Sequence, residues 1–373
     1  MLIAEGFSPD VIVHGAVTLG DMMAADDNIK LSFVSFTIRK RSRPFAQGAL
    51  RLASYARTAI STNRFVTKSF KRNGKTLPHL AEDMRIQALC KAFALEFNAL
   101  VGPEYSIDFI VTTCLQGTSA SATSSGEGEF ISLEPYIGGA HVADAYVKYN
   151  GNNSYVNSAI PDDKVNIAAQ AFSHFTFERS WGTLLVCDLQ GVGRVLTDPA
   201  IHTLDRERFK LTDTNLNEDG FKFFFSTHVC NDVCRQLKLQ SNRSMFISGS
   251  FEYRELWPTM DNTVCCSNKL CGRIVRAASA KRSDEFPGCH WCETCGPQLG
   301  ATKVRWECTA PVPDHQFDVS RFFYESQGRC IPTRCPEHRE KGETVTRAAT
   351  MGEKFFSKFK SKNKAKYTPG KAW

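Results

Sequence analysis

The residues best suited to chemistry gather in the stretch LLVCDLQGVGRVLTDP, which spans residues 184–199. An apolar strand delivers Asp188 where the chain must turn, and strand alternation would place Gln190 on the same face. Asp198 follows a second short apolar segment. Two carboxylates and an amide oxygen are hard ligands that suit Mg²⁺ beside a phosphate substrate. The alternative is a set of polar residues that simply occupy turns.

Lys68 lies inside the apolar strand RFVTKSF, residues 64–70. A lysine within such a strand must extend its ammonium group to solvent or find an anion. Protein kinases use a strand lysine to contact nucleotide phosphates, and Lys68 is a candidate for that role. The alternative is an ordinary lysine at the edge of a sheet.

A second group of chemically active residues is THVCNDVC, where His228, Cys230 and Cys234 lie close together. Structural zinc takes four ligands of this kind, and His174 in AFSHFTFE is the best upstream candidate for the fourth. A zinc ion bound by all four would be closed to substrate and therefore structural. The alternative is a pair of buried thiols beside a packed core histidine.

Most cysteines follow later, since nine of the fourteen lie between residues 265 and 335. Pairs at CxxxxC and CxxC spacing in a turn-rich segment indicate a zinc module. The favoured ligands are Cys266, Cys271, Cys292 and Cys295, with Cys289 as an alternative. A further site would draw on Cys308, His315, Cys335 and His338. The alternative is that several of these thiols are merely buried.

Composition and charge limit the remaining possibilities. The chain has 373 residues, 42% of them hydrophobic, and a net charge of +7 that arises entirely from the lysine-rich residues 339–373. Residues 241–338 are nearly neutral, which disfavours nucleic-acid binding by the zinc module. No apolar run approaches the ~18 residues that cross a bilayer, and no signal peptide is evident. We therefore expect an intracellular protein, cytoplasmic or nuclear, that is not secreted.

Periodicity predicts the elements that must position these residues. The expected helices cover residues 48–56, 80–100, 168–178 and 221–237, and the expected strands cover residues 31–38, 64–70, 107–115, 130–136 and 183–187. Near residue 241 the sequence becomes rich in turn residues and cysteine and has few long periodic segments, which predicts a domain boundary there.

Seven sequence blocks, in this order, resemble those of the α-kinases, the atypical Ser/Thr protein kinases that include myosin heavy chain kinase and the channel-linked kinases. They are PFAQGALRLASYAR, FVTKSF, ISLEPYIGG, YVKYNGN, AFSHFTFE, LLVCDLQGVGRVLTDP and THVCNDVC, and the resemblance runs over residues 31–239. It implies an α+β, two-lobed atypical kinase fold with a structural zinc. Similar Cys-rich extensions accompany α-kinase domains in fungi.

The resemblance also implies roles for individual residues. Lys68 and Arg51 would contact ATP phosphates, and Glu134 would lie at the linker between the lobes, where the family binds adenine. Asp188 would be the catalytic aspartate, with Gln190 and Asp198 as Mg²⁺ ligands. The quartet of His174, His228, Cys230 and Cys234 would be the family's zinc site.

One departure from the family concerns a glycine-rich loop after the metal-binding aspartate. Here the stretch is LTDTNLNEDG, residues 211–220, where Asn217 stands at an expected glycine and only Gly220 remains. Glycine allows backbone to approach phosphate or peptide closely. Its loss bears on the handling of peptide substrate, not on the residues that hold ATP and metal.

We therefore predict an N-terminal segment over residues 1–30, an α-kinase catalytic domain over 31–240 that folds by itself, a Cys-rich zinc-binding extension over 241–338, and a basic, disordered tail over 339–373. The predicted activity is Mg²⁺- and ATP-dependent phosphorylation of Ser or Thr in a protein substrate. The alternative is a weakly active pseudokinase scaffold that binds a partner through its zinc module. The basic tail is a candidate for contact with an anionic surface.

Overall fold

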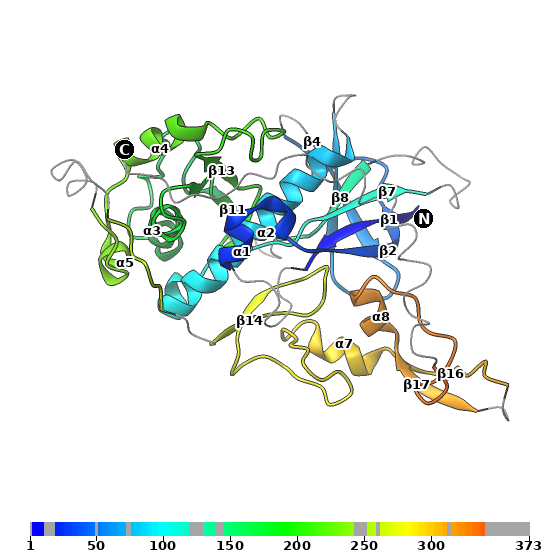
Figure 1. The fold of residues 1–373 in the computed structure, drawn as a ribbon. Coiled ribbons are helices and arrows are strands. Elements are labelled where there is room, and N and C mark those ends of the chain that lie inside the picture. Colours follow the sequence, from blue (N-terminus) through cyan, green and yellow to red (C-terminus); the bar gives the residue numbers. More distant parts are fainter. Residues whose placement is uncertain are drawn as a thin grey trace.

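The first part of the chain forms an antiparallel sheet that closes on itself (Figure 1). In this computed structural model, residues 2–10, 19–48, 51–71, 76–118, 130–138, 145–241, 252–258, 262–311 and 315–339 are described. The sheet has the order β2-β1-β7-β8-β5-β4-β3, and β2 also pairs with β4, so six strands complete a ring. Its strands are β1 (Leu2–Pro9), β2 (Leu31–Lys40), β3 (Ala46–Gln47), β4 (Arg51–Thr58), β5 (Phe65–Phe70), β7 (Thr113–Gly117) and β8 (Phe130–Pro135).

Alternation explains why β2 and β5 form and which way they face. In β2, Val34, Phe36 and Ile38 are buried at every second position. In β5, Phe65 packs into the interior of the ring, and alternation places Lys68 on the opposite face. The strands predicted at residues 31–38, 64–70 and 130–136 are confirmed.

The helix predicted at residues 48–56 is wrong, because this segment contains β4. Arg51–Thr58 pairs with β5 along six residues and with β2 at its far end. The alanines and leucine of the segment favour a helix locally, but cross-strand pairing outweighs that weak preference.

The long helix α2 (Leu77–Leu100) is confirmed and runs along the sheet into the second half of the molecule (Figure 1). After it, the strand predicted at residues 107–115 divides into β6 (Asp108–Phe109) and β7. β6 pairs with β12 of a different sheet, so the chain crosses from one sheet to the other between residues 109 and 113.

The second half carries a four-stranded sheet in the order β6-β12-β11-β9 and a separate pair, β10 with β13. Phe172 and Phe175 of helix α3 meet Phe93 and Phe97 of α2 in its core. The elements are β9 (Tyr146–Lys148), α3 (Lys164–Arg179), β10 (Leu184–Cys187), β11 (Gln190–Val192), β12 (Val195–Thr197), β13 (Ala200–Thr203), α4 (Asn217–Thr227) and α5 (Asp232–Gln236).

The single helix predicted at residues 221–237 is also wrong. It divides into α4, which ends at Thr227 with His228 as its C-cap, and α5. Asn231 begins α5 because its side chain accepts hydrogen bonds from the N–H groups of Val233 and Cys234 (3.0 and 3.1 Å). The break lies between the predicted zinc ligands and lets them converge.

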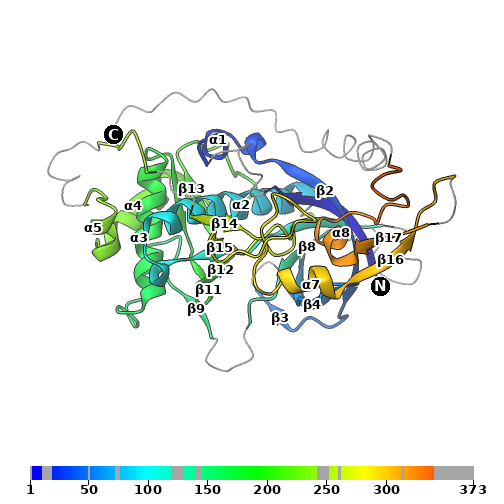
Figure 2. The same ribbon diagram turned by 90° about the horizontal axis from the view of Figure 1, so that it is seen from below.

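The Cys-rich elements lie against the first sheet, as the yellow and orange segments show in both views (Figures 1 and 2). They are β14 (Thr263–Cys265), β15 (Ile274–Arg276), α7 (Gly296–Ala301), β16 (Lys303–Glu307), β17 (Gln316–Ser320) and α8 (Arg321–Ser326). The short helices α1 (Leu19–Ala24), η1 (Asp26–Asn28) and η2 (Pro103–Tyr105) complete the described elements.

Two predictions concern the ends of the chain. β1 lies inside the first sheet, between β2 and β7, so the predicted N-terminal segment 1–30 contributes a central strand. The basic tail lies outside the described residues from position 340 onward. Among the helices that the structure describes, none has the length and apolar character needed to cross a bilayer.

Candidate active site and metal clusters

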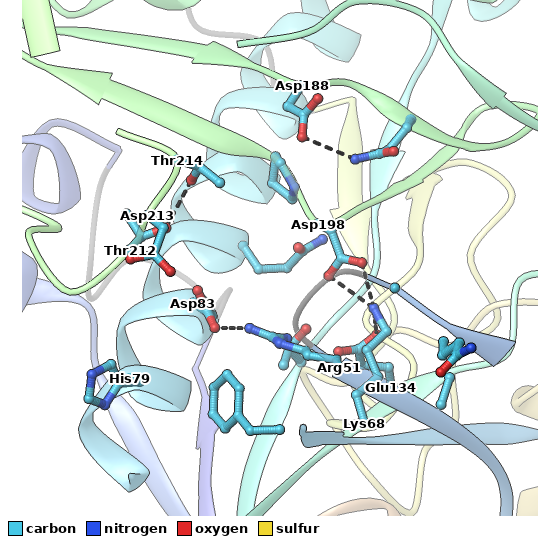
Figure 3. Close-up of a pocket in the computed structure, with 18 of the residues that line it drawn as sticks. Arg51, Lys68, His79, Asp83, Glu134, Asp188, Asp198, Thr212, Asp213 and Thr214 are labelled. Atoms are coloured by element: carbon cyan, nitrogen blue, oxygen red, sulfur yellow. Dashed lines mark hydrogen bonds and ion pairs between the residues drawn. The ribbon is translucent and has the colours of Figure 1, made fainter. Parts of the chain in front are cut away.

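A cavity of about 360 Å³ opens between the two sheets (Figure 3). Strands β4, β5 and β8 and helix α2 supply one side of it, and residues 188–214 of the second half supply the other. Arg51, Lys68, Glu134, Asp188 and Asp198 all line this cavity, and Gln190 does as well. All six residues predicted for ATP and Mg²⁺ therefore meet in one place.

Lys68 is the centre of charge in the cavity. Its Nζ lies 2.8 Å from Glu134 Oε2 and 2.7 Å from Asp198 Oδ2. Burial lowers the pKa of Lys68, but the two carboxylates outweigh burial and raise its pKa above the ordinary value. The ammonium group therefore stays charged and can bind an anion that enters the cavity.

Glu134 is the next-to-last residue of β8. β8 pairs with β5 so that Ser132 lies opposite Lys68 and Glu134 opposite Val66. The buried Glu134 carboxylate is directed at Lys68 (Figure 3). Its side chain thus holds the lysine, and the chain leaves the sheet toward the second half immediately after it.

Arg51 lies on β4 at the same face as Lys68. Its guanidinium forms an ion pair with Asp83 of α2 and lies over the ring of Phe70 at 5.1 Å. The side chains of Arg51 and Asp83 both line the cavity and are partly exposed. The guanidinium of Arg51 can therefore contact an anion in the cavity.

Asp188 occupies the turn between β10 and β11, where its backbone adopts a φ of +57°. Its Oδ1 is 2.5 Å from Lys148 Nζ, and its Oδ2 accepts a hydrogen bond from Gln190 Nε2 at 3.2 Å. Asp188 and Gln190 are neighbours as predicted, but the turn brings them together rather than strand alternation. A left-handed aspartate at a cavity is typical of functional sites.

Asp198 follows β12 and has a φ of +49°. β11 and β12 form a hairpin in which Gln190 lies opposite Thr197, so the hairpin places Asp198 next to Gln190. Gly193, with a φ of +54°, makes the tight turn between the two strands. Burial raises the pKa of Asp198, but the charges of Lys68 and Arg51 outweigh it and hold the pKa below its ordinary value.

The loop that departs from the family pattern borders the cavity through residues 211–214. Glu82 of α2 anchors it by accepting hydrogen bonds from the N–H groups of Leu211 and Thr212 (2.7 and 3.2 Å). Asn217 has a φ of +53°, the left-handed region that glycine adopts freely and that asparagine tolerates better than most residues. Asn217 therefore adopts a backbone conformation that a glycine would also permit.

Gly220 has a packing role instead of a loop role. It lies within α4, and a Cβ atom there would come within 2.2 Å of the His202 ring. The imidazole therefore needs this position to be glycine.

The predicted zinc ligands of the second half converge in one cluster. The ligand atoms of His174, His228, Cys230 and Cys234 all lie within 4.8 Å of one another. His174 Nδ1 is 3.1 Å from His228 Nε2 and 3.7 Å from Cys230 Sγ. The other ring nitrogen of His174 lies 3.2 Å from Glu178, as a metal-bound histidine requires.

A second cluster joins the favoured cysteines of the extension, Cys266, Cys271, Cys292 and Cys295. The Sγ atoms of Cys271 and Cys292 are 3.9 Å apart. Asn63 and Asn268 donate side-chain N–H groups to Cys295 Sγ at 3.6 and 3.3 Å. Cys289, the alternative ligand, is not part of this cluster.

Four residues of these sites were not identified from the sequence. Lys148 lies in the YVKYNGN block, and a lysine on a short strand was the one feature of the sequence that could have marked it as a site residue. Glu82 and Asp83 are acidic residues on a largely apolar helix, and Glu178 follows His174 by one helical turn. The partners of the first three residues are distant in sequence. Glu178 is four residues from its partner His174, so this helical spacing could have been recognised in the sequence.

Comparisons with known proteins agree with this geometry. The chain is 36% identical over 201 residues to myosin heavy chain kinase B of Dictyostelium discoideum, covering 53% of this chain and 25% of that relative. A solved alpha kinase from Entamoeba histolytica matches with a TM-score of 0.55 at 28% identity, over 65% of this chain and 94% of that one. An inactive alpha-kinase domain of myosin heavy chain kinase A, solved with ATP, matches with a TM-score of 0.50 at 25% identity, over 64% and 97%.

The profile of the alpha-kinase family matches residues 46–234, just over half of the chain. This range includes Arg51, Lys68, Glu134, Asp188 and Asp198. The match ends at Cys234, so the Cys-rich extension lies outside it. Sequence blocks, fold and family profile agree, and the chain belongs to the alpha-kinase family.

Proposed function

We propose that this chain is a protein serine/threonine kinase that transfers the γ-phosphoryl group of ATP with the help of Mg²⁺. The observation that carries the proposal is the arrangement of Lys68, held between Glu134 and Asp198, across the cavity from Asp188. A related alpha-kinase domain has been solved with ATP, which supports ATP as the nucleotide.

The residues around Lys68 suit nucleotide phosphates and a hard cation. Lys68 and Arg51 supply the positive charge that phosphate oxygens require. Asp198 and Gln190 offer carboxylate and amide oxygens side by side on one hairpin, the donor set that Mg²⁺ prefers. The cation would neutralise charge on the β- and γ-phosphates. Adenine would lie at the Glu134 end of β8, where the chain leaves the sheet.

Asp188 is the residue proposed to act on the acceptor. Its carboxylate would orient the Ser or Thr hydroxyl and accept its proton as the hydroxyl oxygen bonds to the γ-phosphorus and the bond to the β-phosphate oxygen breaks, which releases ADP. Lys148 and Gln190 hold this carboxylate in place through the contacts already described. Positioning and charge stabilisation supply most of the catalysis.

The pseudokinase alternative has less support. It rests on Asn217, whose backbone keeps the conformation that glycine would adopt. Lys68, Asp188, Gln190 and Asp198 are all present and line one cavity. An inactive scaffold would not need to keep this set.

We also propose structural zinc at the two clusters, His174–His228–Cys230–Cys234 and Cys266–Cys271–Cys292–Cys295. Tetrahedral zinc with bonds of about 2.0–2.3 Å separates its ligand atoms by roughly 3.3–3.8 Å, close to the distances in both clusters. In the histidine-containing cluster, His174, His228 and Cys234 are buried and Cys230 is half-buried, and Glu178 lies beside His174. Cysteines that bind zinc instead of forming disulfides would be consistent with an intracellular protein.

The decisive experiment incubates the purified chain with labelled ATP, Mg²⁺ and a panel of basic threonine peptides. We expect phosphorylation of a peptide or of the chain itself, and Lys68→Ala and Asp198→Ala should each abolish it. Lys222→Ala, which removes an exposed lysine of α4, is the matched control and should remain active. Undiminished incorporation in either site variant would overturn the assignment.

A further inference from the structure

The end of the described chain carries a group of ligands that neither the family match nor the proposed function uses. Cys308 directly follows β16 and His315 directly precedes β17, and the N–H of Cys308 donates to the carbonyl of His315 at 3.1 Å. Cys335 and His338 come from the segment after α8. The N–H of Cys335 donates to Cys308 Sγ at 3.4 Å, which brings this segment onto the hairpin.

The four ligand atoms form a tight group within 4.8 Å of one another. Cys335 Sγ lies 3.3 Å from His315 Nε2 and 3.2 Å from His338 Nδ1, and Cys308 Sγ lies 3.7 Å from His338 Nδ1. Two thiols and two imidazoles at these separations match the donor set and edge lengths of tetrahedral zinc. We propose that this cluster is a third structural zinc site, which fastens the 335–338 segment to the β16–β17 hairpin.

The test is the zinc content of the full chain, purified from cells supplied with zinc. The wild type should hold three zinc ions, and His338→Ala should hold two. His338→Cys should restore the third, because a thiolate can replace the imidazole as a ligand. Cys330→Ser is the matched control, since Cys330 is exposed and lies outside the cluster. Two zinc ions in the wild type, or three in His338→Ala, would overturn the proposal.

A second, independent observation concerns Leu270, which lies between the ligands Cys266 and Cys271. Leu270 is 3% exposed and belongs to the buried cluster whose other members come from all six strands of the ring. Phe65, at the start of the strand that carries Lys68, belongs to the same cluster. A leucine from the Cys-rich segment therefore completes the core of the nucleotide-binding sheet.

Polar contacts fix the connection between β4 and β5 to the same segment. Glu325 of α8 accepts hydrogen bonds from the N–H groups of Ile60 and Ser61 (2.8 and 2.7 Å) and from the Thr58 hydroxyl (3.1 Å). Gln298 of α7 accepts from the Thr62 N–H at 3.0 Å. A carboxylate and an amide thus satisfy three successive backbone donors of this connection.

The segment also reaches the crossing between the two sheets. The N–H of Ile274 donates to Asp108 Oδ2 at 2.9 Å, and the other oxygen of Asp108 is 2.6 Å from the buried Lys91 Nζ. Lys91 belongs to α2 and Asp108 to β6. One ion pair therefore joins the extension to the helix and strand that connect both halves.

From these contacts we infer that the Cys-rich segment is a brace for the nucleotide-binding sheet. Leu270 fills the core behind β5, while Glu325 and Gln298 hold the β4–β5 connection. Arg51 and Lys68 lie on those two strands, so the brace sets the position of the phosphate-binding charges. This inference rests on the proposed function only where it concerns ATP.

The experiment compares Leu270→Ala and Glu325→Gln with two controls in the full chain, Leu256→Ala and Glu293→Gln. Leu256 is 84% exposed and Glu293 is an exposed residue of the same segment. Hydrogen exchange of the 51–70 amides should accelerate at least about fivefold in both brace variants, while the 164–179 amides stay unchanged. Affinity for an ATP analogue should fall at least about fivefold. Neither control should differ from the wild type.

Unchanged exchange over residues 51–70 in both variants would overturn the brace. A wild type that fails to bind the ATP analogue would instead count against the proposed function, because exchange reports on the brace without nucleotide. Leu270→Ala should also lower Tm by several degrees, as expected for a cavity in a core. Faster exchange with full ATP affinity would overturn the link between the brace and the phosphate-binding charges.

Discussion

Lys148 is the charged residue nearest to Asp188, and it comes from the edge strand β9. Register places it opposite Gln190, so β9, β11 and the turn after β10 bring three polar side chains together. Its side chain is 44% exposed, so the ammonium group stays in contact with solvent while it pairs with Asp188. A cation at this point can hold Asp188 and balance negative charge on the incoming phosphoryl group.

Lys148→Met should therefore lower kcat by roughly a hundredfold or more and change the KM for ATP little. Losing one preorganised donor near developing charge typically costs that much, while the ATP-binding residues remain intact. Steady-state kinetics with a peptide substrate would check this, with Lys222→Met as the control. A raised KM for ATP at constant kcat would place Lys148 in nucleotide binding instead.

His202 is a buried residue whose protonation the fold opposes. Its Nδ1 accepts the Leu216 N–H at 3.0 Å, and its Nε2 lies 3.2 Å from the Asn152 carbonyl. Burial lowers the pKa of His202 to about 4, and the hydrogen bond to Asn152 opposes this only in part. The neutral imidazole thus joins the 211–216 loop, β13 and the loop after β9.

The pKa of His202 predicts a loss of stability in mild acid. Between about pH 6.5 and pH 4 the unfolded chain binds the proton and the folded chain does not, so the free energy of unfolding falls as pH falls through this window. The His202 contribution should be roughly 2 kcal/mol between pH 7 and pH 5. Urea unfolding at both pH values, for the wild type and His202→Asn, would check this. Equal pH dependence in both proteins would contradict it.

At the scale of elements, the break between α4 and α5 is what makes the first metal cluster possible. A continuous helix would hold His228 and Cys230 on different faces, whereas the break lets His228, Cys230 and Cys234 face His174 on α3. A metal at this point joins residues 174 and 234, which closes a loop of about 60 residues. Such a metal would therefore hold α3 against residue 234, where the match to the alpha-kinase family ends.

Cys234→Ala should lower stability and solubility more than it lowers ATP affinity in the protein that stays folded. By analogy with a cross-link, losing this closure costs roughly a few kcal/mol. Thermal unfolding and nucleotide binding, measured on the wild type and the variant, would check this. Cys330→Ala is the control, because Cys330 is exposed. Cys90→Ala is unsuitable, because Cys90 is buried and its loss would itself lower stability. A variant that melts normally but loses catalysis would show that the site is not structural.

At the scale of the whole molecule, the predicted boundary near residue 241 does not coincide with a gap in packing. Leu270, Gln298 and Glu325 lie beyond it, and all three contact the first sheet. Gly328 also accepts the N–H of Ser35 in β2 at 3.1 Å. We therefore propose that residues 31–240 need these contacts, and strand β1, for full stability.

A chain that ends at residue 240 should unfold at a Tm at least about 10 °C below that of a chain that ends at residue 339. The shorter chain lacks the leucine that fills the sheet and the acceptors that satisfy the β4–β5 connection, and each such loss costs on the order of 1–3 kcal/mol or more. Calorimetry on both chains would check this. Equal melting temperatures would restore the view that the extension is a separate module.

Much of the site could be predicted because its chemistry resides in residue type and short spacing. The hairpin that carries Gln190 and Asp198 is local, and so is the trio His228, Cys230 and Cys234. The two helices that were predicted wrongly, at residues 48–56 and 221–237, are those in which pairing or ligand geometry outweighs local helical preference. Both errors fall at the edges of functional sites, where local and tertiary demands differ.

The sequence by itself determined which side chains could bind phosphate, Mg²⁺ and zinc, because ligand chemistry depends on side-chain type and the quartets repeat known spacings. Only the tertiary structure decided that Glu134 pairs with Lys68, that Lys148 pairs with Asp188, and that Leu270 lies within the sheet. These contacts join residues that are 40 to more than 200 positions apart. They exist because β5 pairs with β8, because β9 pairs with β11, and because the closed sheet takes a side chain from outside the ring into its interior. No local pattern encodes that closure.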